Sequence, residues 1–130
     1  MRVVYFHFAF LGDESFWAAE AAECAGEQDA FWDYYDYLFS HQNGENQGAF
    51  SQDNLKSFAA ELDLDTDAFN ECLDSGRYTT LVQNMTDIAR QLGVQSTPTF
   101  AINGQGVVGA KEFTEFATII DGLLTTTTEP

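Results

Sequence analysis

One internal proline constrains this chain more than any other single residue. Pro98 stands in Ser-Thr-Pro-Thr, between Gly93, which is placed to end a helix, and an apolar stretch over residues 99–102. A cis peptide bond is a minority state even before proline and is usually kept for a tight, specified turn. The segment is therefore typical of a cis-proline loop, and we expect a cis bond between Thr97 and Pro98.

Residues 13–92 have the apolar spacing of helices. Asp13, Ser51 and either Asp65 or Thr66 are expected to cap helix N-termini. The expected helices cover residues 13–25 and 27–41, one that follows Ser51, a short one that stops near residue 76, and one over 78–92. In the second helix an aromatic stripe is expected to face the core, namely Phe31, Tyr34, Tyr35, Leu38 and Phe39.

The strands are expected at the two ends of this helical region. Residues 3–8 alternate like a strand, and residues 99–102 and 107–108 form two more around Asn103-Gly104, which is a hairpin signal. A closing amphipathic helix is expected over residues 113–124. With 130 residues, of which 45% are hydrophobic, we expect one α/β domain over residues 1–124, followed by a disordered tail at 125–130.

The charge balance excludes some partners. The chain has 21 Asp and Glu against 5 Lys and Arg, a formal net charge of -16. A polyanion would be repelled, so we expect neither nucleic-acid binding nor binding to anionic membranes. No apolar run reaches the ~18 to 20 residues that span a bilayer, and no signal peptide is visible. The compartment stays unknown.

Four segments in order resemble the DsbA-like branch of the thioredoxin superfamily. They are residues 19–28 (AEAAECAGEQ), 31–39 (FWDYYDYLF), 69–76 (FNECLDSG) and the proline loop. The resemblance implies a thioredoxin-like fold with a helical insertion, and thiol–disulfide oxidoreductase chemistry. It also implies that the backbone of Thr97 lies beside catalytic thiols and that Thr97 and Pro98 bind substrate, an extended peptide or a protein thiol.

Two departures from the family pattern matter. Tyr35 stands where the family often has His, and the sequence contains no Cys-x-x-Cys. It begins at what resembles the family's second core strand, so we expect a fold that is N-terminally truncated relative to the family, with no catalytic residue in this chain. The family's usual extracytoplasmic location would apply only to a longer exported parent.

The two cysteines lie in surroundings that disfavour a nucleophilic thiol. Cys24 is near the negative end of its helix among three glutamates, and Cys72 lies beside Glu71 and Asp74 on an apolar face. Two structural alternatives remain, a disulfide between helices or two buried free thiols. The family-like segments and an exported parent favour a structural Cys24–Cys72 disulfide.

No metal or cofactor site is expected. The two cysteines lie far apart, and with His7 and His41 they give no zinc spacing. There is also no glycine-rich phosphate loop.

Three functional hypotheses follow. The chain is part of an oxidoreductase whose catalytic strand and helix lie upstream of Met1, or a redox-inactive module for peptide binding or homo-oligomeric assembly, or a degenerate reading frame without a selected role. In the family the missing strand is central, so its absence leaves unpaired edges. We expect residues 3–8 and 99–102 either to pair directly in antiparallel sense or to be completed by another copy, and we favour a homodimer.

Overall fold

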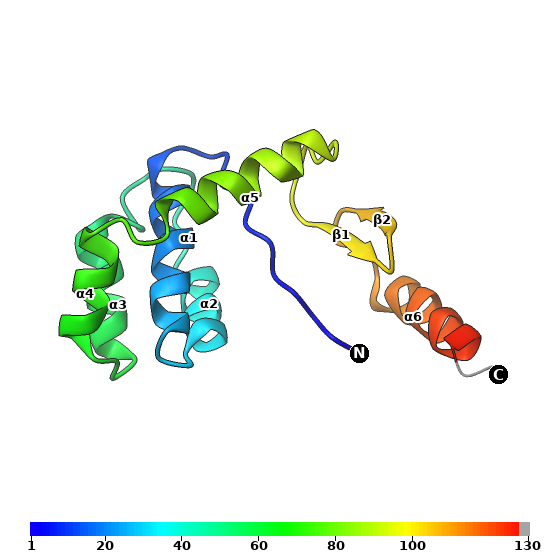
Figure 1. The fold of residues 1–130 in the computed structure, drawn as a ribbon, viewed down its shortest axis with the longest axis horizontal. Coiled ribbons are helices and arrows are strands. Elements are labelled where there is room, and N and C mark those ends of the chain that lie inside the picture. Colours follow the sequence, from blue (N-terminus) through cyan, green and yellow to red (C-terminus); the bar gives the residue numbers. More distant parts are fainter. Residues whose placement is uncertain (128–130) are drawn as a thin grey trace. The chain divides into compact units, whose positions relative to one another are not determined.

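The computed structural model describes residues 1–127, which form helices and one small sheet (Figure 1). The elements are α1 (Asp13–Gly26), α2 (Phe31–Ser40), α3 (Gln52–Glu61), α4 (Thr66–Asp74), α5 (Thr79–Gln91), β1 (Thr99–Ile102), β2 (Gln105–Val108) and α6 (Phe113–Thr127). Contacts divide the chain into two compact units, the helical unit (Met1–Ala89) and the hairpin unit (Arg90 onward). Each is described by itself.

Capping side chains begin two of the helices as expected. The Ser51 hydroxyl accepts a hydrogen bond from Asn54 N at 3.3 Å, and Asp65 Oδ1 accepts one from Ala68 N at 3.1 Å. The expectation that Asp13 caps the first helix is wrong. Gly12 is the N-cap and has φ 91°, a left-handed conformation that glycine adopts without steric cost. Asp13 lies in the first turn, where its carboxylate interacts favourably with the positive end of the helix dipole.

The second helix begins at Phe31 rather than at residue 27, because the chain makes a turn after α1. Asp29 has φ 58°, and Ala30 N donates to the carbonyl of Ala25 at 3.0 Å. A left-handed residue followed by a bond back into the last turn is a usual way to end a helix. This turn sets the direction in which α2 leaves α1.

Helices α1 to α4 enclose the core of the helical unit. Small residues on α1 allow its neighbours to approach closely, and Ala21 and Ala25 are fully buried. Tyr34 is also fully buried, and its hydroxyl donates to the carbonyl of Leu55 at 2.8 Å, which satisfies both polar groups. The largest fully buried side chains of this unit are Tyr34, Phe69, Leu55, Val82, Thr86, Cys24 and Cys72.

The strand expected over residues 3–8 is not present, and the direct pairing expected with residues 99–102 is therefore wrong. Within residues 1–127 the sheet contains β1 and β2 alone. The N-terminal segment is instead held to helices, since Ala9 N donates to Thr86 Oγ1 at 3.0 Å and His7 Nε2 lies 2.8 Å from a Glu23 oxygen. His7 and Ala9 of this segment are buried, whereas Val4 and Phe6 remain 65% and 45% exposed, so the alternating pattern does not bury an apolar face as it would in a sheet.

The hairpin unit contains β1, β2 and α6 (Figure 1). The strands pair in antiparallel sense with Phe100 opposite Val107, and Asn103 and Gly104 form the turn with φ 47° and 85°. Positive φ at both turn residues is what a two-residue hairpin requires, which confirms that prediction. Helix α6 extends through Thr127, past the expected end at residue 124, and residues 128–130 of the expected tail lie outside the described residues.

Burial in the hairpin unit is shallow. Phe100 stacks edge-on against Phe116 of α6, with ring centroids 4.8 Å apart, yet none of residues 90–125 is buried. In the described part of the chain, no helix has the length and apolar character needed to cross a membrane.

Candidate functional site

The proline loop is fastened to the hairpin by two short hydrogen bonds. The Thr97–Pro98 bond is cis. Thr99 Oγ1 donates to the carbonyl of Ser96 at 2.7 Å, and Gly109 N donates to the carbonyl of Pro98 at 2.8 Å. The loop therefore leads directly into β1 with its backbone position fixed on both sides of the proline.

The register of the hairpin determines which backbone groups of β1 are free. In antiparallel pairs, hydrogen-bonded and non-bonded positions alternate, and the residues that flank a two-residue turn are bonded. Ile102 and Phe100 therefore bond to β2, as Pro98 does through Gly109. The N–H and C=O groups of Thr99 and Ala101 point to the opposite edge, which has no strand partner within residues 1–127. We call these groups the free edge of β1.

The two cysteines are joined by a disulfide that ties α1 to α4. The Cα atoms of Cys24 and Cys72 are 5.8 Å apart, and each residue is only 1% exposed. Cys72 shares its buried face with Phe69 and Leu73. Because a thiolate must reach a substrate disulfide to attack it, sulfur atoms at this depth are unsuited to exchange with another protein.

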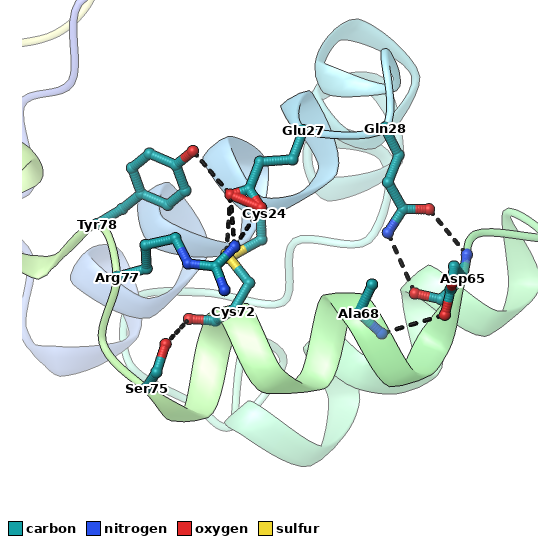
Figure 2. A network of polar contacts seen from close by, with 9 residues as sticks. All are labelled: Cys24, Glu27, Gln28, Asp65, Ala68, Cys72, Ser75, Arg77 and Tyr78. Carbon is teal, nitrogen blue, oxygen red and sulfur yellow. Dashed lines mark hydrogen bonds and ion pairs between the residues drawn. A yellow bond between two sulfur atoms is a disulfide. The ribbon is translucent and has the colours of Figure 1, made fainter.

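A polar cluster lies beside the disulfide (Figure 2). The Glu27 carboxylate accepts hydrogen bonds from Arg77 Nη1 at 2.8 Å and from the Tyr78 hydroxyl at 2.9 Å, and Glu27 Oε2 lies 3.8 Å from Cys72 Sγ. The hydrogen bonds from Arg77 and Tyr78 lower the pKa of Glu27. Burial, followed by the bond to Glu27, raises the pKa of Tyr78. An ionised carboxylate beside sulfur would disfavour a Cys72 thiolate.

Gln28, two residues after the end of α1, adds a second contact in this cluster, to the N-cap residue of α4 (Figure 2). Its side-chain amide donates to the carbonyl of Asp65 at 3.1 Å and accepts from Asp65 N at 2.8 Å. No spacing motif in the sequence indicates this cluster, because Glu27 lies 50 residues from Arg77 and Gln28 lies 37 residues from Asp65. Its geometry is that of a structural brace around the disulfide.

Each of the two histidines contacts a neighbouring side chain. His7 is buried and pairs with Glu23, whereas His41 stacks on the ring of Tyr37 with centroids 3.9 Å apart. The described residues contain no group of three or more His, Cys, Asp or Glu side chains that could hold a metal ion.

A cavity of about 430 Å³ lies within the helical unit, between residues 5–11, α1, α2 and the loop over 42–50. The aromatic stripe of α2 was expected to be core throughout. Tyr34 and Leu38 are buried as expected, but Phe39 is 53% exposed and lines the cavity together with Tyr35. Sequence spacing identifies the face of a helix but not whether a neighbour covers its whole length.

Known proteins resemble this chain along most of its length. A structure of a thioredoxin-like oxidoreductase from Silicibacter pomeroyi covers 94% of this chain and 68% of its own, with a TM-score of 0.75 and 23% identity, which supports the fold. Among curated relatives, a probable disulfide bond formation protein D from Bacillus cereus is 29% identical over 108 residues, or 80% of this chain. A Na(+)/H(+) antiporter NhaA 1 from Salinispora arenicola is 42% identical over 88 residues, or 68% of this chain.

The chain spans only part of these curated relatives, 50% of the B. cereus protein and 13% of the antiporter. The thioredoxin-like fold and the resemblance to disulfide bond formation proteins are both confirmed. A family model described as Thioredoxin matches residues 1–122, and the chain therefore belongs to the thioredoxin family.

Proposed function

We propose that this chain provides the polypeptide-binding part of a thiol–disulfide oxidoreductase, and that its own cysteine pair is structural. The observation that carries the proposal is the free edge of β1, where Thr99 and Ala101 direct backbone donors and acceptors away from β2 next to the Thr97–Pro98 loop. The relatives named as disulfide bond formation proteins support the redox context.

An extended polypeptide would bind by adding a strand to this edge. Main-chain hydrogen bonds supply the affinity in such strand addition, so many sequences are accepted. Each bond contributes about 1 kcal/mol net, because the same groups bond to water when the edge is empty. Ala101 is exposed, which leaves room for the incoming strand.

Exchange itself requires an accessible thiolate and a second thiol that resolves the mixed disulfide. Cys24 and Cys72 are bonded to each other and buried, and the Glu27 carboxylate lies beside the Cys72 sulfur. In this proposal Cys24 and Cys72 do not supply the reacting dithiol, which comes from residues outside this sequence.

Insulin reduction by dithiothreitol tests the absence of exchange activity. The chain and its Cys24→Ser, Cys72→Ser double variant are expected to leave the rate at that of dithiothreitol alone. A faster rate with the parent chain that is lost in the double variant would show that these cysteines are catalytic.

Binding to the free edge is tested with carboxymethylated insulin B chain, which is extended and has no free thiol. Ala101→Pro removes an outward N–H, whereas Ala101→Val keeps it and serves as the matched control. Loss of one hydrogen bond is expected to weaken binding about fivefold in Ala101→Pro only. The bond between Gly109 N and the Pro98 carbonyl, followed by NMR, reports that the hairpin stays intact. Equal affinity of both variants would contradict the proposal.

The same free edge also favours a second candidate, an assembly module in which the edge pairs with another copy. Light scattering at high micromolar concentration distinguishes the two. A dimer that Ala101→Pro dissociates would establish assembly. A strict monomer would exclude it and leave peptide binding.

A further inference from the structure

The cavity in the helical unit has the size and lining of a binding site. Its volume of about 430 Å³ falls in the range of ligand sites, roughly 300–1,000 Å³. Most of its wall is apolar, with Tyr5, Phe31, Tyr35, Leu38, Phe39 and Phe50 among the lining residues. Such a wall favours apolar side chains over polar ligands.

Aromatic side chains continue from the cavity along the surface of α2. Trp32 is 49% and Phe39 is 53% exposed, and Tyr35 lies between them, in ring contact with both at centroid distances of 5.2 and 4.7 Å. The seven-residue spacing from Trp32 to Phe39 corresponds to about 10 Å of helix. We call the cavity and this stripe the α2 groove. Contiguous exposed aromatic side chains of this kind are typical of interaction surfaces.

The charges at the α2 groove are acidic. Asp36 is exposed and lies on the same helix face as Trp32 and Phe39, at i+4 and i−3 spacing. Glu14 and Glu45 line the cavity, and no Lys or Arg does. The Glu14 carboxylate accepts from Gly48 N at 2.6 Å and from Phe50 N at 3.3 Å, which holds the loop in place as one wall. Because Glu14 is buried in this wall, the exposed carboxylates of Asp36 and Glu45 form the acidic rim of a groove whose floor is apolar.

We propose that the α2 groove docks an amphipathic helix of another protein, one that carries Lys or Arg beside its apolar residues. Helix-in-groove binding uses apolar anchors at i, i+3 and i+7, which matches the length of the exposed stripe. A second copy of this chain fits poorly, because its net charge of -16 would be brought against an acidic rim. A small apolar ligand would fill the cavity and leave Trp32 uncovered, since Trp32 is not among the cavity lining.

The probe is a synthetic amphipathic helix of leucine and lysine, titrated into the whole chain and followed by NMR. Amide shifts are expected in residues 5–11 and in α2. The same peptide with glutamate in place of lysine is expected to bind at least about tenfold more weakly, a difference of ~1.4 kcal/mol. Equal binding of the two peptides would overturn the proposed partner chemistry.

Variants test whether the groove is the site. Phe39→Ser removes an anchor and Asp36→Lys reverses a rim charge, and each is expected to weaken binding about tenfold. The matched controls are Phe113→Ser, at a residue 82% exposed in the hairpin unit, and Glu61→Lys, at an exposed acid on α3. Near-ultraviolet circular dichroism verifies that each variant is folded. Groove variants that bind as the controls do would overturn the proposal.

Two further outcomes are informative. Self-association that Phe39→Ser abolishes would make a second copy the occupant and would contradict the proposal. Ala101→Pro, which acts on the free edge of β1, is expected to leave binding of the leucine–lysine helix unchanged. This separates the α2 groove from the proposed strand-binding function.

Discussion

The helical unit and the hairpin unit bury their apolar side chains to different extents. In the helical unit, four helices and a disulfide enclose fully buried residues such as Tyr34, Leu55 and Phe69. In the hairpin unit none of residues 90–125 is buried, although Phe100 and Phe116 stack on each other. Because apolar burial supplies most folding free energy, the helical unit has its own core while the hairpin unit has surface to offer a partner.

The disulfide gives the largest expected difference between the units. Replacing both Cys24 and Cys72 by alanine is expected to lower the free energy of unfolding of the helical unit by about 4 kcal/mol, given the 48-residue separation that the bridge closes. Amide hydrogen exchange, recorded over a range of urea concentrations, measures this loss of unfolding free energy separately in each unit. Dithiothreitol should not change the free energy of unfolding of the double variant, because that variant has no disulfide to reduce. Equal losses in α1 and in β1 would show that the two units unfold as one.

Leucine truncation tests the contrast in burial directly. Leu55→Ala removes a fully buried side chain and is expected to cost about 3 kcal/mol, because it leaves a cavity. Leu92→Ala in the hairpin unit is its matched control and should cost less than about 0.5 kcal/mol, because Leu92 is largely exposed. Urea titration measures both. Similar losses of unfolding free energy in the two variants would show that the hairpin unit buries its apolar side chains as deeply as the helical unit does.

Tyr34 tests how far polar groups are satisfied inside the helical core. Tyr34→Phe deletes the hydroxyl that donates to the carbonyl of Leu55 and is expected to cost about 1 kcal/mol. Tyr37→Phe is the control, since Tyr37 is only partly buried. A free energy of unfolding that changes equally in both variants would show that the buried bond has no special role.

The smallest expected effect concerns the ion pair of Glu27 with Arg77, and it is measured as a change in the pKa of Glu27. Arg77→Ala removes the main cause of the lowered pKa, so the Glu27 pKa is expected to rise toward its ordinary value. With Arg77 present, ionised Glu27 stabilises the folded state above the carboxyl pKa of the unfolded chain, and this is lost as pH falls through the lowered pKa. Carbon-detected NMR titration measures the pKa. Lys56→Ala, which breaks the Lys56–Asp74 ion pair, should leave it unchanged.

Local signals in the sequence predicted much of the fold. Ser51, Asp65 and Asn103-Gly104 act through bonds or φ angles within three residues, and the structure has each of them in that role. The strand expected over residues 3–8 was wrong because an alternating pattern does not specify its partner. The late start of α2 was missed because Asp29 adopts a left-handed conformation that its residue type does not require.

The candidate sites depend on contacts between distant segments. The Thr97–Pro98 loop was visible from its own residues, and the resemblance paired Cys24 with Cys72. The Glu27 cluster and the α2 groove were not visible, because they arise only when α1, α2, α4 and the N-terminal segment pack together. Which half of an aromatic stripe stays exposed is set by this packing.

Amide hydrogen exchange at β1 tests the account most directly. In the free chain, the outward amides of Thr99 and Ala101 are predicted to exchange quickly and those of Phe100 and Ile102 slowly, because only the latter bond to β2. Adding carboxymethylated insulin B chain is predicted to slow exchange at Thr99 and Ala101. Exchange at these two amides that stays fast at saturating peptide, or that is already slow in the free monomer, would contradict binding at the free edge of β1.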